Sequence, residues 1–225
     1  MTQSTSPLLA AHSLSVARGD ALLIEDLSFA VRPGEALHVQ GENGAGKSTL
    51  MLALAGLIPL AAGNVVLDRD GLAFLGHDNG LLPDLSVSEN LDLYAGCGVA
   101  PDVKIAQAMG LSELNRKPAR TLSFGQARRV ALALTCLPDK SVWMLDEPFA
   151  GVDPIAIGEI RSLVAKLTGR GLGVLITDHN VRETLGIIDR AVIIHDGQVL
   201  MEGTAEKIVD HPEVRKYYLG SEFAL

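Results

Sequence analysis

Short apolar runs alternate along the chain with longer segments in which apolar residues recur at helical spacing. The runs that predict strands cover residues 22–31, 36–40, 65–67, 72–75, 141–145 and 173–177. The segments that predict helices cover residues 48–57, 87–94, 103–109, 126–137, 155–167 and 181–187. Two further runs, 190–195 and 198–202, flank Asp196-Gly197 and predict a hairpin. Buried strands alternating with helices are typical of an α/β fold with a mainly parallel sheet and helices on both faces.

The middle of the chain, from about residue 80 to 137, has helical patterns and no strand pattern, so we expect a helical subdomain there. The chain has 225 residues, 48% of them hydrophobic and 20% charged, which is enough for one domain with its own core. The longest apolar run, residues 51–63, contains Gly56 and Pro59 and is too short to cross a bilayer. We therefore expect a soluble protein that reaches a membrane only through a partner.

Charge and cysteine content narrow the function classes. The net charge of −8 argues against nucleic acid as a partner, because nucleic-acid-binding domains present a basic surface. The two cysteines, Cys97 and Cys136, are far apart and have no metal ligands at suitable spacing. We interpret them as reduced thiols rather than as a disulfide.

A phosphate-binding loop follows the predicted strand at 36–40 and precedes the predicted helix at 48–57. Residues 41–48, GENGAGKS, match the pattern G-x-x-x-x-G-K-[ST]. The backbone N–H groups of such a loop surround a phosphate, Lys47 would neutralise the β- and γ-phosphates, and Ser48 would ligate Mg²⁺. The loop indicates nucleotide binding without fixing the reaction, since kinases, GTPases and transport ATPases share it.

Two acids and a histidine follow the most apolar strands. Asp146 and Glu147 come after the strand at 141–145, and ligands of such sheets bind at the carboxyl ends of strands. We expect Asp146 to hold Mg²⁺ through water and Glu147 to polarise the attacking water. His179 follows the strand at 173–177, which we expect to neighbour the first, and a γ-phosphate contact is the favoured role. The alternatives are acids that merely face solvent and a structural histidine.

The segment Leu122-Ser123-Phe124-Gly125-Gln126 resembles the LSGGQ signature of ATP-binding-cassette (ABC) ATPases, with Phe124 where glycine is usual. It lies some twenty residues before Asp146, as in that family, and the resemblance covers roughly residues 8–205. It implies a single P-loop NTPase cassette over 1–225, with an N-terminal antiparallel β subdomain and an extension at about 205–225. It also implies a head-to-tail homodimer that binds ATP with Mg²⁺.

The resemblance assigns roles to individual positions. Glu147 looks like the catalytic base, His179 like the switch histidine, and Asp153 like the acid that crosses the dimer interface. One subunit would hold ATP through Gly41, Asn43, Gly44, Ala45, Gly46, Lys47, Ser48 and Thr49, and the other through Ser123, Gly125 and Gln126.

Two positions depart from the family pattern. Arg18 stands where an aromatic side chain usually stacks on adenine, and a guanidinium can also stack on a purine. His77 stands where a glutamine usually lies between the nucleotide and the transmembrane partner. We expect His77 to bind nucleotide or to join Ser48 and Asp146 in the Mg²⁺ shell, with a pH-sensitive coupling role.

Two parts of the chain resemble different transporters. Residues 18–19, 75–78 and 128–133 resemble the haem exporter ATPase of cytochrome c maturation. Residues 147–154, 176–185 and 218–223 resemble the lipopolysaccharide export ATPase. We expect a peripheral ATPase on the cytoplasmic face of the inner membrane, bound to permease subunits, with lipopolysaccharide favoured as cargo and haem as the alternative. An alternative of another class is a soluble cassette ATPase of iron–sulfur assembly.

Overall fold

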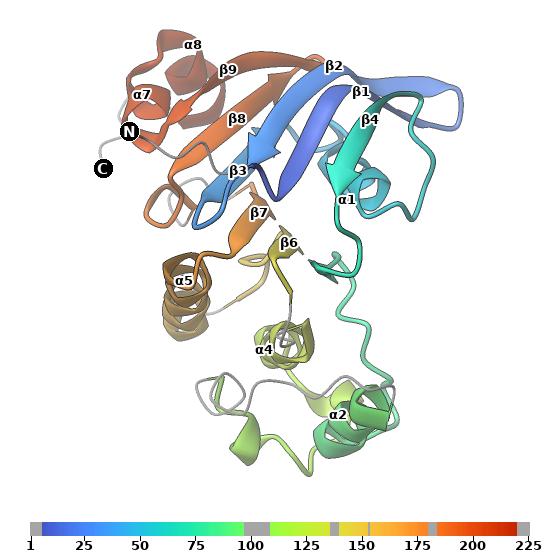
Figure 1. Ribbon diagram of the computed structural model, residues 1–225. Helices are drawn as coiled ribbons and strands as arrows, with labels where there is room; N and C mark the ends of the chain where they lie inside the picture. Colours follow the sequence, from blue (N-terminus) through green and yellow to red (C-terminus); the bar gives the residue numbers. More distant parts are fainter. Residues whose placement is uncertain (1–5, 97–108, 136–139, 153, 180–183, 220–225) are drawn as a thin grey trace.

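The computed structural model describes residues 6–96, 109–135, 140–152, 154–179 and 184–219 (Figure 1). Several sequence predictions fall outside these ranges: both cysteines, Asp153, most of the predicted helix at 103–109 and the first part of that at 181–187. No helix within the described ranges is both long and apolar enough to cross a membrane.

A six-stranded sheet forms the centre of the fold. Its strands are, in order across the sheet, β5 (Leu72–Leu75), β6 (Val142–Asp146), β7 (Gly173–Thr177), β3 (Ala36–Gly41), β8 (Arg190–His195) and β9 (Gln198–Thr204). The first five are mutually parallel, and β8 pairs with β9 in the predicted antiparallel hairpin. Every residue of β3, β6 and β7 is buried. The mainly parallel sheet expected from the apolar runs is therefore confirmed.

A second sheet of three antiparallel strands lies beside the first. Its order is β2 (Ala21–Val31), β1 (Leu9–Arg18) and β4 (Ala62–Leu67). The hydrophobic pattern did not predict β1, because two buried triplets are separated by exposed His12 and Ser13. Ser13 has φ of 46°, and the register of both pairings shifts there. A bulge at this point removes the period of two that identifies a strand.

The central sheet has a separate hydrophobic core on each face. Along β6, Trp143 and Leu145 pack with α4 (Phe124–Thr135) and α5 (Pro154–Gly169). Val142 and Met144 point to the other face and pack with α1 (Lys47–Leu54) and with β1 and β2. The alternation follows from the period of two in a strand, and it gives the helix-covered faces that the sequence predicted.

The helices that cover the face of the central sheet with Trp143 and Leu145 extend away from the antiparallel sheet. Figure 1 shows α4 and α2 (Val87–Gly96) at the end of the molecule opposite β1, β2 and β4. Two short 3₁₀ turns, η1 (Leu111–Glu113) and η2 (Ala119–Thr121), connect this region. Helix α4 begins two residues before the sequence predicted, and α1 ends three residues earlier, just before Gly56 with φ of 74°. Whether residues 80–137 form a subdomain of their own stays a prediction.

The last described residues pack on the β8–β9 hairpin. Helices α7 (Ala205–Asp210) and α8 (Pro212–Val214) and the single turn η3 (Arg215–Leu219) share a small core with that hairpin. His195 stacks on Tyr217 with ring centroids 4.7 Å apart, and the Tyr218 hydroxyl donates to the Ile194 carbonyl at 2.9 Å. The turn is thereby joined to the end of β8, next to the phosphate loop.

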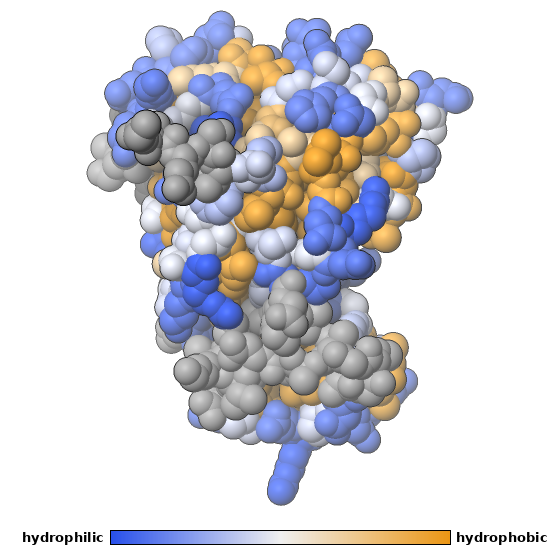
Figure 2. All heavy atoms as spheres, viewed as in Figure 1, coloured by the Kyte–Doolittle hydropathy of each residue, from blue (hydrophilic) through white to orange (hydrophobic). Residues whose placement is uncertain are grey.

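The surface of the antiparallel sheet is partly apolar. Figure 2 shows apolar surface gathered over β1 and β4. The exposed apolar side chains of the described residues include Val66 in β4, which is 56% exposed. Scattered exposed apolar residues are ordinary in folded proteins, so this feature alone indicates no function.

We expect Gly63→Ala to destabilise the protein, because Gly63 lies in β4 with φ of 82° and meets the bulge of β1. An added Cβ would lie 2.3 Å from the Ser13 carbonyl oxygen and 2.5 Å from that of His12, and both are backbone atoms. The expected loss in the free energy of unfolding is about 2 to 3 kcal/mol. Urea unfolding followed by the fluorescence of Trp143, which is the single tryptophan, measures it.

The matched control is Gly158→Ala in the middle of α5, where an added Cβ meets nothing within 4 Å. That change should leave stability equal or raise it by up to about 1 kcal/mol. Equal midpoints for Gly63→Ala and the wild type would contradict the tight β1–β4 contact.

Candidate functional site

The carboxyl ends of four parallel strands meet along one edge of the central sheet. Because β5, β6, β7 and β3 are neighbours and run in the same direction, the segments after them lie close together. These segments carry His77, the pair Asp146-Glu147, the pair Asp178-His179 and the loop 41–48. The expected neighbourhood of the strands before Glu147 and His179 is confirmed by the direct pairing of β6 with β7.

The phosphate loop is built around two glycines in left-handed conformation. Gly44 has φ of 87° and Gly46 has φ of 92°, and Gly46 is the N-cap residue of α1. A Cβ at Gly46 would meet the Leu23 Cβ at 2.9 Å, so both the backbone angle and the space require glycine. Helix α1 therefore begins at Lys47, with its N-terminus at the loop.

Lys47 is buried inside the loop. Its ammonium group donates to the carbonyl oxygens of Gly41 at 2.8 Å and Glu42 at 2.9 Å. Burial lowers the pKa of Lys47, whereas the nearby charges of Glu147, Asp146 and Asp178 oppose that shift. The cation thus already lies opposite the acids at the ends of β6 and β7.

Hydrogen bonds between β6 and β7 fix the acids. The Thr177 hydroxyl donates to Asp146 Oδ1 at 2.5 Å, and the Glu147 N–H donates to the Thr177 carbonyl at 2.7 Å. Asp178 is fully buried and accepts from the Phe149 N–H at 3.0 Å. Glu147 has φ of 51°, a left-handed backbone that costs energy in a residue with a Cβ. The turn directs its carboxylate toward the shared edge of the sheet.

Two histidines flank the Glu147 carboxylate. Its Oε2 lies 3.7 Å from His77 Nδ1 and 4.0 Å from His179 Nδ1. Both imidazoles are more than half exposed, whereas the Glu147 side chain is 21% exposed. The structure therefore brings together three residues that the sequence selected from three distant segments, although their individual roles stay predictions.

Arg18 lies where two hollows of the surface meet. One, of about 440 Å³, is the more polar of the two and is lined by Lys47, Glu147, His179 and residues of the phosphate loop. The other, of about 560 Å³, is mostly apolar and is lined by Leu52, Ile58, Pro59, Leu60 and neighbouring residues. Arg18, Ser48 and Thr49 line both. The two hollows form one continuous surface beside the loop.

The signature residues bond to one another at the start of α4. Ser123 Oγ accepts from the Gln126 N–H at 3.2 Å, and the Ser123 N–H donates to Gln126 Oε1 at 3.1 Å. This reciprocal pair caps the N-terminus of α4. Within the described part of the chain, no hydrogen bond or ion pair links Ser123, Gly125 or Gln126 to residues 41–49. The two predicted ATP-binding sets are therefore not bonded to each other within the described residues of one copy.

Phe124, the departure from the signature, packs on the turn after β6. Its ring is 46% exposed and lies against Gly151, where an added Cβ would be 2.8 Å from Phe124 Cδ1. Gly151 has φ of 62°, so the turn needs glycine for its backbone as well as for its space. The contact links the signature to the turn that precedes Asp153.

Sequence reasoning did not single out two buried cations or bases near this edge. Arg128 of α4 is 1% exposed and bonds to residues after β5 and to Asp146, the last residue of β6. His38 of β3 is fully buried, and its Nε2 lies 3.1 Å from the Asp178 carbonyl oxygen. Burial lowers the pKa of His38 to about 4, so its imidazole is neutral at physiological pH. The sequence signal that could have identified these two residues is a polar residue inside an otherwise apolar run.

Comparisons with known proteins agree with this arrangement of motifs at one edge of the central sheet. Residues 24–150 match the profile of the ABC transporter family. A probable ABC transporter ATP-binding protein of Azorhizobium caulinodans is 42% identical over 96% of this chain and 84% of its own length. The lipopolysaccharide export system ATP-binding protein LptB of Acidithiobacillus ferridurans is 39% identical over 98% of this chain and 100% of its own.

A solved structure shares the fold as well. The ATP-binding subunit of an ABC transporter superposes with a TM-score of 0.81 and 25% identity, covering 94% of this chain and 96% of its own. The match to this structure and the match to the family profile together confirm the cassette fold expected from the resemblance. The chain belongs to the ABC transporter family, as an ATP-binding subunit that hydrolyses ATP to energise transport.

Proposed function

We propose that the chain works as a head-to-tail homodimer with membrane permease subunits, on the cytoplasmic face of the inner membrane, and that it drives lipopolysaccharide export. The observation that carries the catalytic part is the position of Glu147. Its carboxylate lies between His77 and His179, at the edge of the sheet where the phosphate loop also ends.

The two hollows beside Arg18 suit the two halves of ATP. The triphosphate occupies the polar hollow, where the Lys47 ammonium exchanges the carbonyl oxygens of Gly41 and Glu42 for phosphate oxygens. The base lies over the guanidinium of Arg18, whose neighbouring hollow is lined by Leu52, Ile58 and Leu60. In this arrangement the Arg18 cation contacts the face of the purine, and apolar side chains lie below the purine. Together they replace the usual aromatic platform.

Glu147 orients and polarises the water that attacks the γ-phosphate, and His179 contacts that phosphate. The left-handed turn at Glu147 aims the carboxylate, and the backbone bond to Thr177 holds the turn. The His77 imidazole, 3.7 Å from the same carboxylate, bonds to the water or to the phosphate. Each group lies at the end of its own strand, and the strand order of the central sheet brings the three together.

Ser48 and Asp146 fit a magnesium ion that arrives with the nucleotide. The described residues include no group of three or more His, Cys, Asp or Glu side chains placed as a metal site. Mg²⁺ bound with ATP does not require one, since phosphates and waters complete its octahedral shell around one or two protein oxygens. One carboxylate oxygen of Asp146 accepts from Thr177, and the other is available to a metal-bound water. The bound ion would neutralise charge on the phosphates.

The proposed dimer is supported by the absence of bonds between the two ATP-binding sets within the described residues of one copy. Ser123, Gly125 and Gln126 present a capped helix N-terminus with no phosphate loop of the same chain bonded to it. A helix N-terminus favours an anion through its dipole and N–H groups. A second copy in head-to-tail orientation would supply the phosphate, and Asp153 would lie at the contact.

The surface near α2 suits a permease. Leu82 and Leu93 expose 46% and 47% of their surfaces, on the loop after β5 and on α2. His77 begins the same loop, so the segment from 77 to 95 extends from the catalytic carboxylate to an apolar surface. We assign this surface to a helix of the transmembrane partner.

Lipopolysaccharide is the favoured cargo because two relatives, those of Acidithiobacillus ferridurans and Escherichia coli, are lipopolysaccharide export ATP-binding proteins. They are 39% and 35% identical and match almost the whole chain. Haem is the second candidate, since residues 18–19, 75–78 and 128–133 resemble the haem exporter ATPase. An iron–sulfur assembly ATPase, the alternative without a permease, is separated from both by the capture experiment below.

Glu147→Gln should bind ATP normally and lose turnover by at least about a hundredfold, because the amide cannot act as a base. The variant should accumulate as an ATP-bound dimer. Steady-state phosphate release and size-exclusion chromatography with and without ATP measure the two effects.

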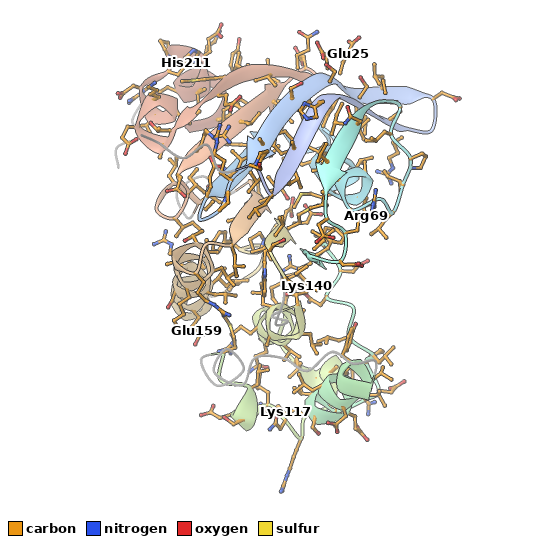
Figure 3. All side chains as sticks on the ribbon, in the orientation of Figure 1. Glu25, Arg69, Lys117, Lys140, Glu159 and His211 are labelled. Atoms are coloured by element: carbon orange, nitrogen blue, oxygen red, sulfur yellow. The ribbon has the colours of Figure 1, made fainter. Side chains whose placement is uncertain are left out.

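The control is Glu25→Gln, which changes an exposed glutamate at the outer edge of the antiparallel sheet, away from α4 (Figure 3). It should hydrolyse ATP at the wild-type rate. Wild-type turnover in Glu147→Gln would exclude Glu147 as the base, and a monomer in the presence of ATP would exclude the trapped dimer.

Arg18→Ala should weaken ATP binding about fivefold, which corresponds to the loss of about 1 kcal/mol of stacking. Arg18→Tyr should bind ATP at least as tightly as the wild type. Titration calorimetry with ATP and with inorganic triphosphate separates the base from the phosphates. If triphosphate binding falls as much as ATP binding, Arg18 acts on the phosphates and the stacking proposal fails.

Capture of the tagged chain from detergent-solubilised membranes should recover integral membrane permease subunits. A lipopolysaccharide permease supports the favoured cargo, and a haem permease supports the second candidate. Recovery of soluble partners alone would exclude transport across a membrane as the function of the captured complex.

A further inference from the structure

A buried guanidinium joins the signature helix to both catalytic segments. Arg128 lies in α4, four residues after Phe124, and is 1% exposed. Its Nη1 donates to the carbonyl oxygens of Gly76 at 2.8 Å and His77 at 3.3 Å and to Asn79 Oδ1 at 3.1 Å. Its Nη2 donates to the Asp146 carbonyl oxygen. One side chain thus connects α4 to the segment after β5 and to the end of β6.

The acceptors are the peptide groups that carry the catalytic side chains. The Asp146 carbonyl belongs to the peptide bond that leads into Glu147, whose φ is 51°. The His77 carbonyl belongs to the residue whose imidazole lies 3.7 Å from the Glu147 carboxylate. The planar fork of an arginine can hold two such acceptors at a fixed separation, whereas a lysine ammonium is a single point.

The charge of Arg128 is compensated by its surroundings. Burial lowers its pKa to about 10, and the charges of Asp146, Asp178 and Glu147 oppose that shift, so the guanidinium stays protonated at neutral pH. A buried charge that loses its partners is costly, which ties the three segments to one geometry. The Arg128 guanidinium and the Lys47 ammonium are thus two buried cations close to the same three acids.

We propose that Arg128 is a positioning residue that makes the placement of His77 and Glu147 depend on the signature helix. It touches neither ATP nor the attacking water, and it acts through the two backbone carbonyls. A displacement of α4 shifts both peptide groups together, because both accept hydrogen bonds from one rigid guanidinium. The proposal rests on the assignment of Glu147 as the base.

The neighbouring arginine provides a matched comparison. Arg129 lies in the same helix but pairs with Glu159 of α5 at 3.3 Å, and Figure 3 labels Glu159 on that helix. Its bonds hold α4 to α5 and reach neither His77 nor Glu147. A residue that only stabilises the position of α4 would behave as Arg129 does.

Arg128→Lys should therefore lower kcat about ten- to a hundredfold while KM and the dissociation constant for ATP change less than about twofold. Arg129→Lys should change none of these values by more than about twofold. Asn79→Ala removes one acceptor at a partly exposed position and should lower kcat about two- to fivefold in the same sense. Asn79→Ala keeps the test valid if Arg128→Lys does not fold.

A double-mutant cycle separates positioning from general stability. In a Glu147→Gln background, single-turnover hydrolysis should be much less sensitive to Arg128→Lys, since only the part of the effect that acts through His77 remains. Equal proportional losses in both backgrounds, or an unchanged kcat in Arg128→Lys, would overturn the proposal. If Glu147→Gln itself keeps full turnover, the assignment of the base fails instead, which is a distinguishable result.

Discussion

The parallel pairing of four buried strands is the constraint on which the site depends. Strands β5, β6, β7 and β3 run in one direction, so the chain leaves each of them at the same edge of the sheet. A phosphate loop, two acids and two histidines from distant segments become neighbours for that reason. The cores on the two faces hold this register, because a slip of one residue would turn Trp143 and Leu145 of β6 away from α4 and α5.

The site concentrates charge, and the fold compensates that charge locally. Asp146, Glu147 and Asp178 lie opposite Lys47 and Arg128, and each of the two cations is buried and bonded to backbone carbonyls. The left-handed turn at Glu147 adds backbone strain that the bonds to Thr177 and Arg128 offset. Backbone strain and buried charge of this kind lower stability, and they are typical of functional sites.

The departures from the family pattern are accommodated by neighbouring residues. Arg18, proposed to take the place of an aromatic platform, adjoins an apolar hollow. His77 replaces an amide, and its ring reaches the same carboxylate as His179 does. Phe124 replaces a glycine, and its ring rests on Gly151, which has no side chain to obstruct it. Arg18 and His77 thus lie beside the phosphate loop and Glu147, whereas Phe124 packs on the turn after β6.

The sequence by itself determined the elements and the motif-bearing loops. Strands 36–40, 141–145 and 173–177 are short apolar runs, and the loop 41–48 needs glycine for its backbone, so local pattern is sufficient. Local pattern failed for β1, where the bulge at Ser13 breaks the alternation. The tertiary structure alone decided which side chains meet: His77 and Glu147 are seventy residues apart in the chain, and Arg128 bonds to both of their segments. Such contacts depend on strand order and helix packing, because a charged residue in a helical pattern reads as solvent-facing until its neighbours are placed.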